Sequence, residues 1–160
     1  MIAAPFIGQR GVVRPDWLSA GTPHLNLAYY LVLFHEGSLA LFEALGIGKT
    51  YREETGQACF ASETHLVYEQ EMKLGDTAMV ATTLLDADDR RLHFAHEMFR
   101  PDEDRRVCLQ ELLFVNVDTR TSRAASWTEA ARERIGAALA AHAVLPHPAK
   151  TGRSIGIKRA

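Results

Sequence analysis

Cysteine is scarce in this sequence: the 160 residues include two, Cys59 and Cys108, and no Cys-x-x-Cys pair. Small secreted domains with little core rely on several disulfides, and structural zinc sites use closely spaced cysteines and histidines. Neither pattern is present, which argues against a disulfide framework and against a zinc-binding module. We therefore expect reduced cysteines and a cytoplasmic protein.

An excess of charge of one sign is also missing. Lys and Arg number 18 against 20 Asp and Glu, which gives a net charge of -2 and a pI near 6.4. Proteins that bind nucleic acid or anionic membranes concentrate positive charge on one surface or segment. We therefore expect no nucleic-acid partner and no membrane partner.

Long apolar runs are absent as well. The longest, Leu27–Phe34, is far shorter than the roughly 20 residues that span a bilayer. The first residues, MIAAPFIGQRG, carry no basic segment before their apolar residues, which argues against a signal peptide. A chain of this length supports one domain with a real core. We expect one domain over residues 1–145 and an extended basic tail over residues 146–160.

The sequence does contain the pattern of a long helix at residues 26–45. Asn26 is a suitable N-cap and Gly46 a suitable stop, and the first half is apolar on every side, as in a helix buried in an interior. A capping box from Ser126 to Glu129 predicts a second helix that runs to about Ala141. We expect this second helix at the periphery of the domain.

Between the two helices, apolar and polar residues alternate with period two, as in half-buried strands. Strands are predicted at residues 61–72, 77–85, 92–99 and 107–117, with turns at 75–76, 86–91 and 101–106 and a short β-like piece at 9–17 that Pro15 ends. This order predicts an α+β fold: an antiparallel meander within a curled sheet of about five strands around the central helix. The uncovered helix and sheet edge favour a homodimer or homotetramer.

Three segments carry a family resemblance: HLNLAYY at residues 24–30, SETHLVYEQEMKLGD at 62–76 and LLDADDRRLHFAHEM at 84–98. In their order they resemble the hotdog-fold acyl-CoA thioesterases, and within these the 4-hydroxybenzoyl-CoA thioesterase-like branch, in particular the thioesterases associated with carnitine and betaine breakdown. The resemblance covers most of the chain. It implies an acyl-CoA partner, a thioester hydrolase, and no cofactor beyond the coenzyme A of the substrate.

The loop before the long helix is the first candidate site. Thioester hydrolysis needs a base or nucleophile at the carbonyl carbon and donors for the oxyanion. The loop delivers His24 and Asn26 to a helix start, where free backbone N–H groups can bind negative charge. The resembling family carries an Asp a few residues before this His, but the aligned position here holds Ala20, or Ser19 with one insertion.

A catalytic carboxylate must therefore come from elsewhere, and three candidates remain. Glu63 ranks first, because it shares one face of a predicted strand with His65, and such a pair can act as base and orienting group. Asp16, just before the loop, ranks second. Glu36, on the long helix, ranks third as a residue that a neighbouring subunit could use.

Further residues are candidates for holding the substrate. Trp17, Tyr29, Tyr30 and Tyr68 flank the loop, and aromatic faces attract quaternary ammonium groups such as those of betaine-like acyl chains. In the tail, Arg153, Lys158 and Arg159 are candidates for the phosphates of coenzyme A.

We expect no metal site, because His93 and His96 fall on opposite faces of one predicted strand. Cys108 lies within another strand and is interpreted as a small buried hydrophobe. Two alternatives to the thioesterase stay open: a non-catalytic acyl-CoA or small-ligand binding protein that lost its carboxylate, and, least favoured, a hotdog hydratase. The hydratase would need an Asp five residues before the His, where this chain has Ser19.

Overall fold

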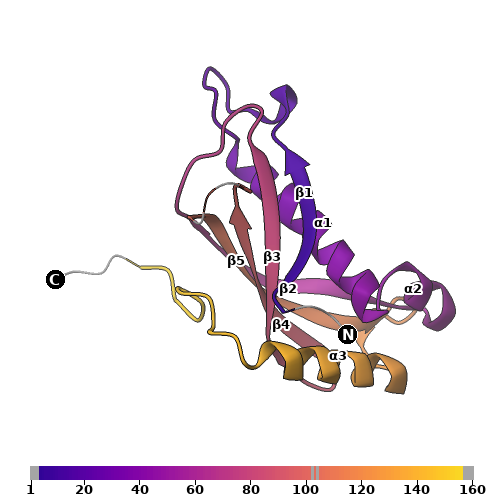
Figure 1. Cartoon of the computed structure of the whole chain (residues 1–160). Helices are drawn as coiled ribbons and strands as arrows, with labels where there is room; N and C mark the ends of the chain where they lie inside the picture. Colours follow the sequence, from indigo (N-terminus) through magenta and orange to yellow (C-terminus); the bar gives the residue numbers. More distant parts are fainter. Residues whose placement is uncertain (1–3, 102, 104, 157–160) are drawn as a thin grey trace.

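The structure, a computed structural model, describes residues 4–101, 103 and 105–156, and at its centre a curled antiparallel sheet holds one long helix (Figure 1). Five strands lie in the order β1-β3-β4-β5-β2, and a short β6 pairs with β5. The strands are β1 Phe6–Val12, β2 Gln57–Tyr68, β3 Thr77–Ala87, β4 Arg91–Phe99, β5 Arg106–Asp118 and β6 Arg123–Ala124. The helices are η1 Pro15–Trp17, α1 Leu27–Leu45, α2 Lys49–Thr55 and α3 Glu129–His142. This arrangement confirms the predicted hotdog fold.

Helix α1 begins and ends as the sequence predicts. Asn26 caps its first turn, and Gly46 ends it with a left-handed φ of 68° that glycine adopts without a steric penalty. The side that faces the sheet is buried by Tyr30, Leu33, Phe34, Gly37, Ser38, Leu41, Phe42 and Leu45. Burial of the first half on every side was a wrong prediction for the single chain, since Leu27 is 66% and Leu31 38% exposed. The sheet covers one side of α1 and leaves an apolar side open.

The predicted four-stranded meander is wrong in one pairing. β3, β4 and β5 do follow one another as neighbours, but β2 pairs with β5, from Tyr68↔Cys108 to Gln57↔Asp118, while β3 pairs with β1. Period-two alternation reports the two faces of a strand and carries no information about its neighbours. As a result, residues 69–76 are a crossover from one edge of the sheet toward the other, rather than part of a hairpin.

Helix α3 contributes to the core more than a peripheral helix would. Ala131, Ile135 and Ala138 lie in the same buried cluster as Leu41 and Phe42 of α1. Its N-cap is Thr128, whose side chain accepts from the Ala131 N–H, and so the helix begins at Glu129 rather than at the capping box predicted from Ser126. The short helix α2 was not predicted, because its residues KTYREET show no apolar stripe.

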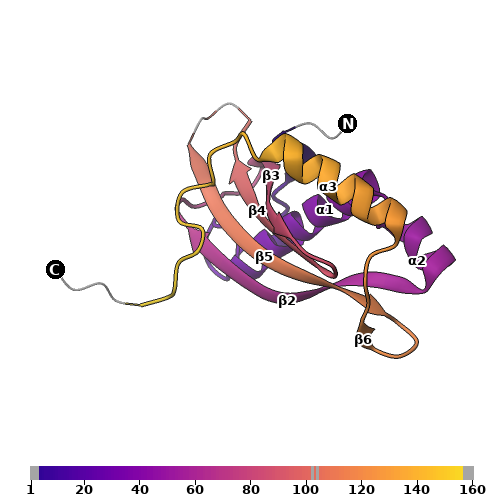
Figure 2. The same ribbon diagram turned by 90° about the horizontal axis from the view of Figure 1, so that it is seen from below.

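After α3 the chain runs along the outer face of the sheet, away from α1 (Figure 2). Pro148 is buried there, and the Arg106 guanidinium donates to the Ala149 carbonyl at 2.9 Å. Farther along, the Gly152 N–H donates to Glu111 Oε2 at 2.8 Å. These contacts hold residues 148–152 of the tail against β5.

Candidate active site

The start of α1 presents polar groups that the helix itself does not use. Asn26 Oδ1 accepts from the Ala28 N–H at 3.0 Å, and the Tyr29 N–H donates to the Asn26 carbonyl at 3.0 Å. Within the described chain, the Leu27 N–H and the Asn26 side-chain NH₂ have no hydrogen-bond partner. Asn26 is therefore the N-cap, and two donors remain open at the positive end of the helix dipole.

The loop before α1 is closed on itself by backbone hydrogen bonds. The Ser19 N–H donates to the His24 carbonyl at 2.9 Å, and the Thr22 N–H donates to the Ser19 carbonyl at 3.1 Å. Gly21 takes a φ of 74° at the tip, a conformation that costs glycine little. Ser19 and Ala20 carry no carboxylate, so this loop lacks the Asp that the resembling thioesterases have at this position.

A second loop, the crossover of residues 69–76, packs against the first. The Leu25 N–H donates to the Met72 carbonyl at 2.8 Å, the Leu74 N–H donates to the Pro23 carbonyl at 3.2 Å, and His24 forms a β-bridge with Lys73. These bonds bring the end of β2 to the start of α1. The site is therefore built from two loops that are far apart in the sequence.

The crossover supplies a carboxylate that sequence reasoning missed. Glu71 Oε2 lies 3.0 Å from His24 Nδ1, and Glu71 Oε1 lies 3.0 Å from the Lys73 ammonium. Lys73 and then His24 are the main groups that lower the pKa of this carboxyl, so it is ionised at neutral pH. The available signal was an acidic residue just past a strand end, and only the crossover makes it a neighbour of His24.

The aromatic residues predicted to hold the substrate do lie near this start, but they differ in exposure. Trp17 stacks on Tyr29 with ring centroids 5.4 Å apart, and the Arg14 guanidinium carbon lies 4.4 Å from the Trp17 centroid. Tyr30 is 4% exposed, and its hydroxyl accepts from the Met72 N–H at 3.0 Å. Burial raises the pKa of Tyr30. Tyr68 packs edge-on against Tyr30. With 46% of its surface exposed, Tyr68 is the most exposed of the four aromatic residues.

Asp16 lies on the 3-10 turn η1 and is directed to another partner. Its carboxylate pairs with the Arg14 guanidinium at 2.9 Å, and both side chains are exposed. No contact joins it to His24 or to the start of α1 within the described residues.

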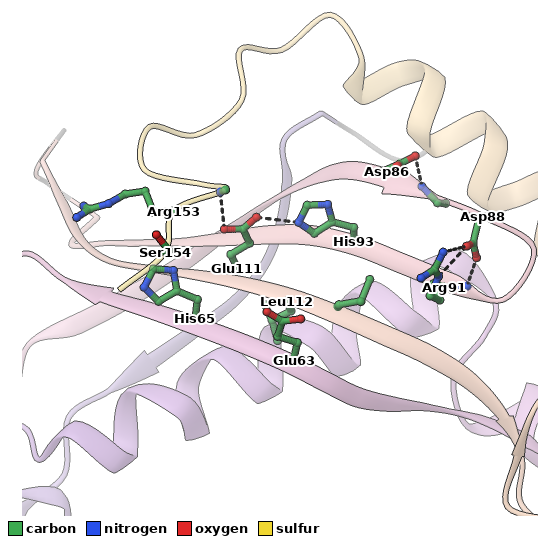
Figure 3. Close-up of a pocket in the computed structure, with 13 residues that line it drawn as sticks. Glu63, His65, Asp86, Asp88, Arg91, His93, Glu111, Leu112, Arg153 and Ser154 are labelled. Carbon is green, nitrogen blue, oxygen red and sulfur yellow. Dashed lines mark hydrogen bonds and ion pairs between the residues drawn. The ribbon is translucent and has the colours of Figure 1, made fainter. Parts of the chain in front are cut away.

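Glu63, His65 and Arg153 come together elsewhere, in a cavity of about 610 Å³ on the outer face of the sheet (Figure 3). Beside them, His93 Nε2 lies 2.9 Å from Glu111 Oε1. The sheet separates this outer-face pocket from α1, so within one chain Glu63 does not reach the helix start. Lys158 and Arg159 lie outside the described residues.

His93 and His96 are indeed on opposite faces of β4. His96 is fully buried on the side of α1, where Nε2 lies 2.8 Å from Ser38 Oγ and Nδ1 lies 2.7 Å from Thr82 Oγ1. Burial lowers the pKa of His96 to about 3, and so its ring is neutral. Cys108 is also fully buried, and burial raises the pKa of its thiol to about 12, which fits its interpretation as a small hydrophobe.

No cluster of three or more His, Cys, Asp or Glu side chains in the described part of the chain is arranged to hold a metal ion. Over the same residues, no single helix is both long and apolar enough to cross a membrane; α1 and α2 pass only when joined, and they meet at 60°.

Known proteins resemble this chain in sequence and in structure. A betainyl-CoA thioesterase of Pseudomonas aeruginosa is 32% identical over 145 residues, which cover 91% of each chain. An L-carnitine dehydrogenase/betainyl-CoA thioesterase of Rhizobium meliloti is 27% identical over 85% of this chain, which spans only 27% of that longer protein. A Staphylococcus aureus protein solved in complex with CoA has the same fold, with a TM-score of 0.89, 22% identity, and coverage of 99% and 98% of the two chains.

The family model of the thioesterase-like superfamily matches residues 13–135, a stretch that begins just after β1 and extends into α3. It includes both loops of the candidate site and every long strand except β1. The chain therefore belongs to the thioesterase-like superfamily.

Proposed function

We propose that this protein is an acyl-CoA thioesterase that hydrolyses acyl-CoAs with a betaine-like or carnitine-like acyl group. The observation that carries the proposal is the start of α1, where two free donors lie beside His24. The name of the Pseudomonas aeruginosa relative supports the same substrate class.

The helix start suits the charge that forms during thioester hydrolysis. When water adds to the carbonyl carbon, negative charge develops on the carbonyl oxygen, and fixed donors stabilise it most where water is excluded. The Leu27 N–H and the Asn26 NH₂ are the donors that we assign to this oxygen. The reaction consumes only water, so it requires no cofactor other than the coenzyme A of the substrate.

A cationic acyl group fits the aromatic residues around this start. Tyr68 is the open ring, and we assign it the quaternary ammonium group. One face of Trp17 is covered by Tyr29, and Arg14 lies over its ring. Because Arg14 is itself a cation on that ring, its charge would repel a ligand cation there, and we therefore prefer Tyr68 to Trp17 for the ammonium group.

The coenzyme A moiety is anionic, and the tail supplies positive charge. We keep Arg153, Lys158 and Arg159 as the candidates that bind its phosphates.

Three predicted residues remain candidate acid or base groups away from the start of α1. They are Glu63, His65 and Asp16. Substitution of Glu63 decides whether the outer-face pocket contributes to turnover.

A second copy of the chain would complete the site. Large apolar side chains are exposed along one surface. They are Leu27, Leu31, Val32 and Leu39 of α1, Phe60 and Tyr68 of β2, and Leu74 of the crossover. β2 is an edge strand, so the backbone N–H and C=O groups along its open side have no neighbouring strand. Proteins normally cover such an edge. We propose a homodimer in the cytoplasm through this surface, with a homotetramer as the larger alternative.

The test is the release of free thiol from a panel of short acyl-CoAs by the purified protein, followed with a thiol reagent. Turnover that is fastest for cationic acyl-CoAs supports the proposal. If acyl-CoA binds but no member of the panel is hydrolysed, the second candidate function holds, a binding protein, which the absence of acid at Ser19 and Ala20 favours.

A further inference from the structure

We propose that Glu71 replaces the acid that the loop before α1 lacks, and that it does so by positioning His24 as the general base of hydrolysis. In this proposal His24 is the catalytic residue and Glu71 is a positioning residue. The inference rests on the proposed thioesterase function and assigns the source of its base.

The geometry of the pair has the features of an oriented base. His24 Nδ1 is buried and lies 3.0 Å from Glu71 Oε2, which is within ion-pair distance, although the two groups are not aligned as a hydrogen bond. The side chain as a whole is 39% exposed, and Nε2 forms no hydrogen bond with any described residue. One nitrogen therefore faces a carboxylate while the other is left for a proton from water, which is the division of labour of a carboxylate–histidine pair.

The backbone around Glu71 holds the pair in place. The Arg100 guanidinium donates to the Glu71 carbonyl, and the same guanidinium donates to Asp76 Oδ2 at 3.0 Å. Lys73, the β-bridge partner of His24, donates through its N–H to Asp76 Oδ2 at 3.0 Å. Both loops of the site thus have a fixed register, and Glu71 and His24 need no large rearrangement to meet.

The charges around His24 favour an ionised partner. Glu71 is anionic, Lys73 lies on its other oxygen at 3.0 Å, and Arg100 is the next cation. An ionised carboxylate stabilises the imidazolium that forms during the reaction, and Lys73 makes transfer of the proton onto Glu71 unfavourable. Glu71 therefore stays charged while His24 takes and returns the proton.

Water is the only reactant besides the thioester in this hydrolysis. The water oxygen bonds to the thioester carbonyl carbon while its proton passes to His24 Nε2, and the electron pair of the C=O bond moves to the oxygen. When the carbonyl re-forms, the C–S bond breaks with its electron pair on sulfur. The proton on Nε2 then passes to that sulfur, which gives the carboxylic acid and free coenzyme A.

The decisive experiment uses Glu71→Gln, His24→Gln and the double variant, with steady-state thiol release measured across pH. We expect each single variant to lose about 100-fold or more in kcat with KM changed little. Since the two residues act as one unit, the double variant should cost no more than His24→Gln alone.

Two further variants separate positioning from folding. Glu54→Gln, the same change at an exposed residue of α2, is the matched control and should keep wild-type kcat. Glu71→Asp keeps the charge and should retain more activity than Glu71→Gln, with the KM of the wild type. Thermal melting of the single Glu71 variants should match the wild type, because the Glu71 side chain is 54% exposed.

The outcomes distinguish the two proposals. If the wild type turns over and Glu71→Gln equals it, or if Glu63→Gln alone abolishes turnover, the assignment of Glu71 is overturned and the thioesterase stands. If the wild type releases no thiol from any acyl-CoA, the proposed function fails first.

Discussion

His96 Nε2 lies 2.8 Å from Ser38 Oγ, and this contact joins the inner face of β4 to the buried side of α1. Nδ1 of the same ring lies 2.7 Å from Thr82 Oγ1 on β3. Since burial lowers the pKa of His96 to about 3, the ring that links helix and sheet is neutral. Protonation would place an unpaired charge inside the core.

This relationship predicts a pH-dependent stability. The unfolded chain protonates His96 at about pH 6.5, whereas the folded chain does so only at about pH 3. Between these values the unfolded state binds more protons, so the free energy of unfolding falls as the pH falls. We expect a lower urea midpoint at about pH 5.5 than at about pH 7, a window above the titration of most carboxyl groups.

The variant His96→Gln should remove part of that pH difference and should be about 1–3 kcal/mol less stable at neutral pH, because Ser38 and Thr82 lose their partner. His147→Gln, at an exposed histidine of the tail, is the matched control and should change neither quantity. An unchanged pH difference in His96→Gln would rule out His96 as its source.

A second prediction concerns the attachment of the tail. Arg106, 12% exposed, pairs with Glu69 at 2.9 Å and with Glu97 at 2.6 Å, and it also donates to the Ala149 carbonyl. Its guanidinium lowers the pKa of Glu69 to about 2. Arg106→Met leaves two partly buried carboxylates without this partner, and we expect a loss of about 2–4 kcal/mol of stability.

Limited proteolysis of Arg106→Met should also cut the tail sooner than in the wild type. Arg120→Met is the matched control, because Arg120 pairs with Asp118 while its side chain is 77% exposed, and such pairs contribute about 0–1 kcal/mol. An equal loss of stability in the two variants would show that the Arg106 ion pairs stabilise the fold no more than an exposed pair does.

Much of the fold could be predicted from the sequence because it depends on local patterns. Asn26 and Gly46 mark the ends of α1 by the hydrogen bonds and φ angle that those residues provide, and the period-two segments fall on strands. The pairing of β2 with β5 could not be predicted in the same way. It depends on contacts between segments whose own patterns are compatible with several neighbours.

The same distinction between local patterns and contacts of distant segments applies to the candidate active site. The donor side, His24 and Asn26, lies in one continuous segment and could be found by reading it. Glu71 could not, because a crossover of the chain brings it to His24, and Glu71 looks like any acidic residue after a strand. Glu63 and His65 do share a face, as predicted, but that face looks away from α1.

A third prediction tests the ring assigned to the cationic group. Tyr68→Leu should raise KM for a cationic acyl-CoA by about 2- to 30-fold and leave kcat nearly unchanged, because it removes an aromatic face and keeps an apolar side chain. Tyr68→Phe keeps the face and should behave like the wild type. A similar rise in KM for a neutral acyl-CoA in Tyr68→Leu would indicate packing rather than cation–π attraction.

A fourth prediction concerns assembly. Leu31→Lys places a charge on the open apolar side of α1, and we expect it to shift the protein from dimer to monomer in analytical ultracentrifugation and to reduce turnover. Glu53→Lys, on the exposed α2, also changes charge and should leave the dimer intact. A monomeric wild type with full activity would contradict the proposed dimer site.

The most direct test of the proposed thioesterase function compares two substrates of nearly the same shape with the wild-type protein. Betainyl-CoA carries a trimethylammonium group, and 3,3-dimethylbutyryl-CoA carries an uncharged tert-butyl group in its place. We predict release of free coenzyme A from both, with kcat/KM about 2- to 30-fold higher for betainyl-CoA. If neither substrate releases coenzyme A faster than it does in buffer alone, the protein is not a thioesterase for this substrate class.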